Sequence, residues 1–121
     1  MNEIYVTYCS ARKNERYDLI PAIERYQSIR IRRVYELSRG RMLILSGRFG
    51  LLRPNTAIPY YDHLLQQEEV NELAERVAMQ LRELGVQRVI FVEHQLRALQ
   101  YREAMARACR MAGVEMVVME L

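Results

Sequence analysis

The sequence has no long hydrophobic run. Its longest apolar stretches, such as VIFV before Glu93, fall far short of the roughly 20 residues that a membrane-spanning helix needs. Its first residues, MNEIYVTYC, lack the basic segment followed by a long apolar segment that marks a secretory signal. We therefore expect a cytoplasmic protein with no membrane partner.

Cysteine is scarce as well. Cys9 and Cys109 lie far apart in core-like segments, so the sequence holds neither a disulfide framework nor a CxxC metal pair. The only histidines, His63 and His94, follow Asp62 and Glu93, but no HxxxH spacing accompanies them. The motifs GxxxxGK[S/T] and GxGxxG are also missing, which disfavours a P-loop or a dinucleotide-binding Rossmann site. We expect no metal and no cofactor.

Lysine occurs once. Of the 18 basic residues, 17 are arginine and the other is Lys13. An amine differs from a guanidinium because it can lose its proton when it is desolvated, and it can then act as a base or a nucleophile. Lys13 is therefore a candidate catalytic residue, and the alternative is a solvated surface lysine.

The length and composition fit one soluble globular domain covering residues 1–121. Half of the residues are hydrophobic and 27% are charged, and 121 residues are enough to bury one core. The formal net charge of +3 is modest.

Apolar periodicity predicts an alternation of strands and helices. We expect strands at 3–9, 42–45, 88–92 and 115–121. Helices are expected at about 20–37, with a possible break near Pro21 and Tyr26, and at 67–84 and 95–112. In the first helix, Ile29, Val34 and Leu37 would face inward. Because every connection contains a helix, the strands should pair in parallel through right-handed crossovers. The predicted fold is a three-layer α/β/α domain with a four-stranded, mainly parallel sheet.

In such a sheet, ligands bind beyond the carboxyl ends of the strands. The loops in question begin at Cys9, Ser46 and Glu93. The second, at about 46–65, is far longer than the usual 2 to 6 residues, yet it is too apolar to be disordered. It therefore either holds polar groups at fixed positions or is a packed connection without a ligand.

The sequence of this long loop resembles that of a known protein family. The run LSGRFGLLRP at 45–54, followed by PYYD at 59–62, resembles the signature of the YaaA-type peroxide-stress proteins and of small bacterial and phage domains similar to them. The segment CSARK at 9–13 resembles their Ser/Cys-x-x-Lys element, and YQS at 26–28 resembles their Tyr-x-Gly/Ser element. The chain is about half as long as the YaaA-type proteins and lacks the later segments linked with DNA binding there. The resemblance implies a stress-response setting and a nucleotide or nucleic-acid partner.

The loops and the resemblance select one set of candidate residues. Lys13 and Asp62 are the catalytic candidates, with Asp62 as a general base or, alternatively, an N-cap for a helical turn near 63–67. Ser10 and Ser46 can face a ligand or cap the backbone locally, and Cys9 is expected to be an inert core thiol rather than a nucleophile. The full substrate-binding set is Ser10, Tyr26, Ser28, Ser46, Gly47, Arg48, Gly50 and Tyr61.

Arginines gather in one stretch of the sequence and are opposed there only by Glu36. Such a cluster attracts phosphate-bearing partners, but it is also typical of a solvated helix face. Its members are Arg30, Arg32, Arg33, Arg39, Arg41, Arg48 and Arg53.

Three functions remain open. The first is an enzyme or binding domain for a nucleotide, nucleoside or nucleic acid, in which the Lys13 amine could attack the sugar C1′. The second is a non-enzymatic nucleic-acid-binding module that uses the arginine-rich surface. The third is a small-ligand sensor.

Overall fold

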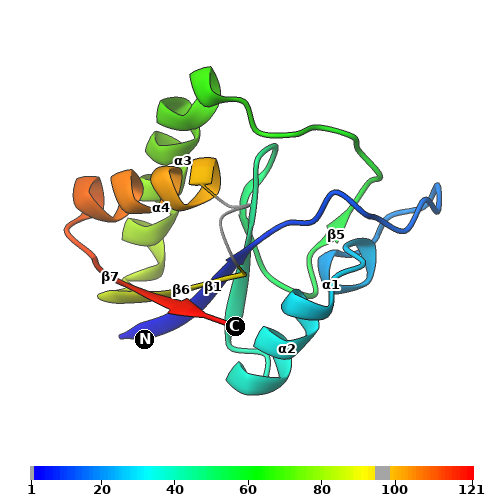
Figure 1. Ribbon diagram of the computed structural model, residues 1–121, viewed down its shortest axis with the longest axis horizontal. Helices are drawn as coiled ribbons and strands as arrows, with labels where there is room; N and C mark the ends of the chain where they lie inside the picture. Colours follow the sequence, from blue (N-terminus) through cyan, green and yellow to red (C-terminus); the bar gives the residue numbers. More distant parts are fainter. Residues whose placement is uncertain (1, 95–98) are drawn as a thin grey trace.

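A five-stranded, mainly parallel sheet forms the centre of the molecule (Figure 1). The computed structural model describes residues 2–94 and 99–121. The strand order is β4-β3-β1-β6-β7. Neighbouring strands are parallel except at one edge, where β4 runs antiparallel to β3. The strands are β1 (Glu3–Tyr8), β3 (Met42–Ser46), β4 (Gly50–Leu52), β6 (Arg88–Glu93) and β7 (Glu115–Glu120).

The prediction of four strands is wrong because β4 was read as part of a loop. A tight turn at 47–49 reverses the chain, and Gly50 takes a φ of 77° that favours glycine. The Ser46 hydroxyl accepts hydrogen bonds from the backbone N–H groups of Arg48 and Phe49, at 3.1 and 3.0 Å. These contacts close a β3–β4 hairpin, so this connection contains no helix.

The helix predicted at about 20–37 is broken at Tyr26, one of the two places where the sequence allowed a break, and its first two residues are not helical. Ile20–Pro21 forms β2, which pairs with β5 (Ala57–Ile58) in a separate two-stranded sheet. The short helix α1 (Ala22–Arg25) then ends at an extended Tyr26, and α2 (Ile29–Ser38) begins after it. The helix boundary is fixed by Ser28, whose side chain accepts a hydrogen bond from the Ile31 N–H at 3.2 Å.

This later helix start changes which residues of α2 face inward. Val34 is buried as predicted, together with Ile31. The inward placement of Ile29 and Leu37 is wrong, since their exposed fractions are 80% and 53%.

Two longer helices complete the described part of the chain. The turn η1 (Gln67–Glu69) leads into α3 (Val70–Leu84), whose predicted apolar stripe is largely buried. α4 (Leu99–Ala112) packs against α3, whereas α2 packs against β1 and β3 (Figure 1). The first four residues of the helix predicted at 95–112, residues 95–98, lie outside the described residues. None of the described helices has the length and apolar character needed to cross a bilayer.

The sheet arrangement determines where the loops meet. β1 has β3 on one side and β6 on the other, all three parallel, so their carboxyl ends share one edge. The loops that begin at Cys9, Ser46 and His94 therefore leave the sheet at the same end, as the sequence predicts.

Candidate functional site

A cavity of about 400 Å³ lies beyond the carboxyl ends of β1 and β6. We call it the main cavity. The loop after β1 forms one part of its wall, and the segment at 62–64, the start of α2 and the start of α4 form the rest. The lining residues are Tyr8, Cys9, Ser10, Ala11, Lys13, Ser28, Arg30, Asp62, His63, Leu64, His94 and Tyr101.

Arg30 is the most firmly held cation of the main cavity. Its guanidinium stacks on the Tyr8 ring, 3.5 Å from the ring centroid. It donates hydrogen bonds to the Thr7 hydroxyl at 2.5 Å and to the carbonyls of Tyr8 and Cys9 at 2.6 and 3.3 Å. Burial lowers the pKa of the Arg30 guanidinium, and no carboxylate among the described residues forms an ion pair with it.

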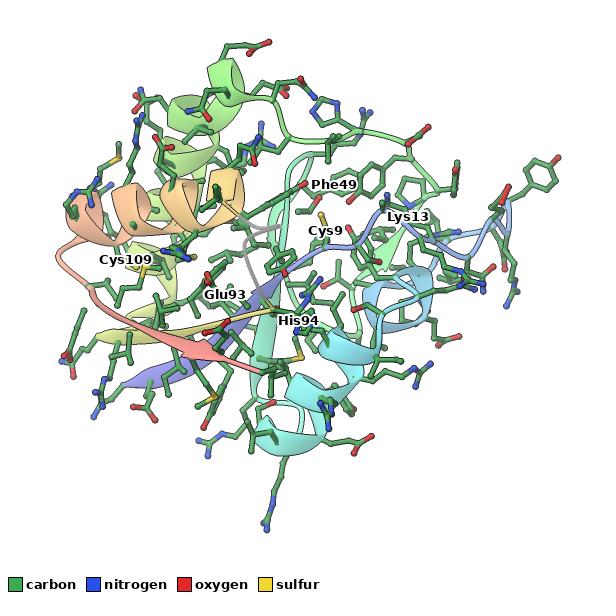
Figure 2. The ribbon with its side chains drawn as sticks, in the orientation of Figure 1. Cys9, Lys13, Phe49, Glu93, His94 and Cys109 are labelled. Carbon is green, nitrogen blue, oxygen red and sulfur yellow. The ribbon has the colours of Figure 1, made fainter. Side chains whose placement is uncertain are left out.

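Lys13 supplies a second cation to the same cavity. Its ammonium lies 4.7 Å from the centroid of the Tyr61 ring and 5.9 Å from that of Tyr26, and it donates a long hydrogen bond to the Ala11 carbonyl at 3.4 Å. A backbone bridge to Tyr26 holds this part of the loop extended. Figure 2 shows Cys9 and Lys13 on the chain that leaves β1. The described residues include no carboxylate that pairs with Lys13.

Three further predicted residues line the main cavity. The Ser10 hydroxyl donates to the Arg12 carbonyl at 2.7 Å, and Ser28 caps α2, so both hydroxyls also make local backbone contacts. The Asp62 side chain is exposed and makes no hydrogen bond or ion pair with the described residues. The turn that follows is capped by Gln66 instead, so Asp62 does not have the alternative N-cap role.

A pair of tyrosines forms the aromatic part of the wall. The rings of Tyr8 and Tyr101 stack with centroids 5.7 Å apart. The Cys9 thiol donates to the Tyr101 hydroxyl at 3.5 Å, and burial raises the pKa of Tyr101. Cys9 is buried, as expected, although it touches the cavity.

Other residues of the predicted substrate-binding set form an internal network. The hydroxyls of Tyr26 and Tyr61 share a short hydrogen bond, and Tyr61 is also 3.0 Å from the Ser46 hydroxyl. Burial raises the pKa of Tyr26 to about 12 and raises that of Tyr61 as well. All three residues are buried, and none lines the main cavity. The Tyr26 and Tyr61 rings of this network lie next to the Lys13 amine.

Gly47 and Arg48 line a second, smaller cavity of about 200 Å³, which shares His63 with the main cavity. Gly50 lines neither of these cavities, and a Cβ added at this position would contact the Gln80 side chain of α3. The predicted set is thus divided. Ser10, Lys13, Ser28 and Asp62 come together, and the remaining residues build the hairpin, the network or the second cavity.

Three of the four acidic and histidine residues considered as metal ligands, Glu93, His63 and His94, have other partners. Arg102 donates two hydrogen bonds to the Glu93 carboxylate, at 2.8 and 2.6 Å, and this interaction raises the pKa of the Arg102 guanidinium. His63 pairs with Glu69 at 3.0 Å, and the His94 ring lies 3.0 Å from the Leu121 carbonyl. Within residues 2–94 and 99–121, no cluster of three or more such side chains could hold a metal ion.

The arginine cluster does not occupy a single face. Arg30 points into the main cavity, and Arg48 lies at the hairpin turn beside the second cavity. Arg41 and Arg53 line a depression at the opposite end of β3. The five residues of β3 place that end about 16 Å from the hairpin turn.

Three lining residues of the main cavity were not predicted from the sequence as members of the site: Tyr8, Arg30 and Tyr101. His94 lies in the third strand-end loop that the sequence selects. Arg30 could have been found from its place two residues after the helix-capping Ser28, next to the loops. Tyr101 carried no signal, because its spacing is that of a core residue.

Family models, curated proteins and solved structures were compared with the chain, and no match was found. The relationship to the YaaA-type proteins therefore stays a prediction from the motifs.

Proposed function

We propose that the protein binds a nucleotide or nucleoside substrate in the main cavity. The observation that carries this proposal is the grouping of two cations, Lys13 and Arg30, neither of which pairs with a carboxylate of the described residues, beside a stacked tyrosine pair. A phosphate complements the cations, and the small exposed parts of the two tyrosine rings offer edge contacts to an aromatic base.

The size and position of the cavity support the same ligand class. About 400 Å³ lies within the range typical of small-molecule sites. The carboxyl edge of a parallel sheet is also where α/β proteins usually bind ligands. Ser28 begins α2 at this cavity, and the first turn of a helix favours anions.

Lys13 and Asp62 are the residues we propose for chemistry on the bound ligand. Lys13 binds the phosphate as a cation until Asp62 accepts its proton; Arg30 then holds the phosphate, and the neutral Lys13 amine can form a bond to the sugar C1′. As this bond forms, the bond between C1′ and the base breaks. Its electron pair leaves with the base, which takes up the proton held by Asp62. The ring network of Tyr26 and Tyr61 would position the amine.

Two broader inferences accompany this proposal. The β1–β3 and β6–β7 crossovers run in opposite directions along the sheet, so right-handed connections would place α2 on one face and α4 on the other, as a three-layer domain. We also propose a distant relationship to the YaaA-type proteins and a cytoplasmic location. A non-enzymatic module using the arginine surface is less well supported, because the arginines are spread over both ends of β3.

Calorimetric titration with thymidine monophosphate and thymidine tests the proposal. The monophosphate should bind more tightly than the nucleoside. Lys13→Met should weaken its binding roughly tenfold to a hundredfold, because a charged hydrogen bond is worth about 1.5–3 kcal/mol. Arg33→Met, at an exposed position on α2 outside the main cavity, is the matched control. An unchanged affinity in Lys13→Met would refute the assignment.

Chromatography of the same mixtures separates an enzyme from a sensor. Release of free base by the wild type, lost in Lys13→Met and Asp62→Asn, supports the chemistry. Binding without any product would remove the catalytic part and leave a small-ligand sensor.

A further inference from the structure

A groove of about 520 Å³ adjoins the main cavity. Its lining includes Arg12, Asn14, Gln27, Ile29 and Arg32. Ser28 lines both the groove and the main cavity. The two hollows therefore share one lining residue, the N-cap of α2.

The groove has the chemistry of a surface that binds a nucleic-acid strand. Arg12 and Arg32 are exposed and form no ion pair with the described residues. Among the residues that the structure describes, Glu24 is the single carboxylate in its lining. Ile29 is 80% exposed, an unusual degree for isoleucine, and it offers an apolar surface beside the two guanidinium groups.

The backbone explains why the two hollows carry consecutive basic residues. Residues 12 and 13 lie in an extended segment, held by the Lys13–Tyr26 bridge and by a hydrogen bond from the Gln27 N–H to the Arg12 carbonyl at 3.0 Å. Successive side chains of an extended chain point to opposite sides. Lys13 therefore enters the main cavity and Arg12 enters the groove.

From this juxtaposition we propose that the substrate is a nucleotide within a single strand of nucleic acid, an inference that rests on the proposed function. One nucleotide occupies the main cavity, and the strand continues past Ser28 into the groove. There, Arg12 and Arg32 bind its phosphates and Ile29 contacts the next base. A single strand fits because its bases are free to leave the stack and enter a cavity, whereas those of a duplex must first be unpaired.

The test compares two probes, thymidine monophosphate and a labelled hexathymidylate, by calorimetry and fluorescence anisotropy. The test variant is Arg12→Gln/Arg32→Gln. The matched control is Arg33→Gln/Arg110→Gln, which removes the same charge from exposed positions that line neither hollow.

We expect the wild type to bind the hexathymidylate more tightly than the monophosphate. The test variant should lose at least tenfold in affinity for the hexathymidylate and keep its affinity for the monophosphate within twofold. Its slope of log affinity against log salt should fall in magnitude by about 1.4, at about 0.7 for each of two lost phosphate contacts on a single strand. The control should resemble the wild type with both probes.

Two results would overturn this inference alone. The first is an unchanged affinity of the test variant for the hexathymidylate, and the second is an equal loss for both probes. In either case the wild type would still bind the monophosphate, and the proposed function would stand. If neither probe binds the wild type, the proposed function fails as well.

Discussion

Replacing Arg25 with methionine should destabilise the protein strongly. The Arg25 side chain is completely buried at the end of α1. Its guanidinium donates hydrogen bonds to the carbonyls of Asn14, Arg16, Asp18 and Ile58, at 2.7, 2.9, 2.7 and 3.0 Å. These four bonds fasten the loop after β1 to β5.

The magnitude follows from two opposing effects. Four charged hydrogen bonds at about 1.5–3 kcal/mol each would amount to roughly 6–12 kcal/mol. Burying a guanidinium that has no carboxylate partner among the described residues costs several kcal/mol, and the Arg25 Nε atom has no hydrogen-bond partner within residues 2–94 and 99–121. We therefore expect Arg25→Met to lower the free energy of unfolding by about 3 kcal/mol. Arg25→Lys should lose nearly as much, since an ammonium cannot reproduce the planar fork.

Urea denaturation measures the effect. With a slope near 1.5 kcal/mol per molar, a loss of about 3 kcal/mol moves the midpoint down by about 2 M. Trypsin should also cleave the variant faster after Arg12, Lys13 and Arg16, because the loop loses its anchor. Arg33→Met is the exposed control. A wild-type midpoint and cleavage pattern in Arg25→Met would refute this account of the loop.

Two further predictions concern the free energy of unfolding. Burial raises the pKa of the Cys109 thiol from 9.0 to about 11, so its contribution is fully present below pH 9 and is lost as the pH rises through 11. In urea titrations, this should lower the free energy of unfolding of the wild type by about 2 kcal/mol between pH 9 and pH 11, a loss absent from Cys109→Ala; parallel pH profiles would contradict it. Gly50→Ala should cost about 2–4 kcal/mol, because φ is 77° and the new Cβ would lie 2.5 Å from the Gln80 side chain that binds Leu51. Gly85→Ala, at a φ of 67° in open space, should cost only about 1 kcal/mol, and equal thermal shifts would refute the packing argument.

The regular elements could be predicted because each has a strong periodic signal. α3 combines an apolar stripe with a closing Gly85, and its predicted range differs from the observed one mainly in the first turn. The wholly apolar strand β3 is buried along its whole length, as the sequence indicates for a parallel strand. β4 could not be predicted, since its three residues pair only because the 47–49 turn returns them to β3.

The segment at 20–37, which supplies Ser28 and Arg30 to the main cavity, was harder to predict because its local signals conflict. An apolar pattern at 20–37 is compatible with one helix, but the extended conformation of Tyr26 and the cap at Ser28 divide it. This division places Arg30 at the main cavity and leaves Ile29 exposed in the groove.

The candidate residues divide in the same way. Position at a strand end selects Ser10 and Lys13, because parallel strands bring their ends together. It does not tell a cavity-lining hydroxyl from a buried one. Ser46 ends a strand too, yet its hydroxyl caps the hairpin turn and faces Tyr61. That distinction depends on the β3–β4 hairpin, which no local sequence pattern predicts.

The central claim is that the substrate phosphate lies between Lys13 and the start of α2. A nitrogen-15 NMR titration of the wild type with thymidine monophosphate tests it most directly. We predict saturable shifts at the backbone amides of 10–13 and 28–31, with little change at Arg41 and Arg53 beyond the opposite end of β3. Shifts centred on Arg48 and the second cavity, or no saturable shift at millimolar ligand, would contradict the claim.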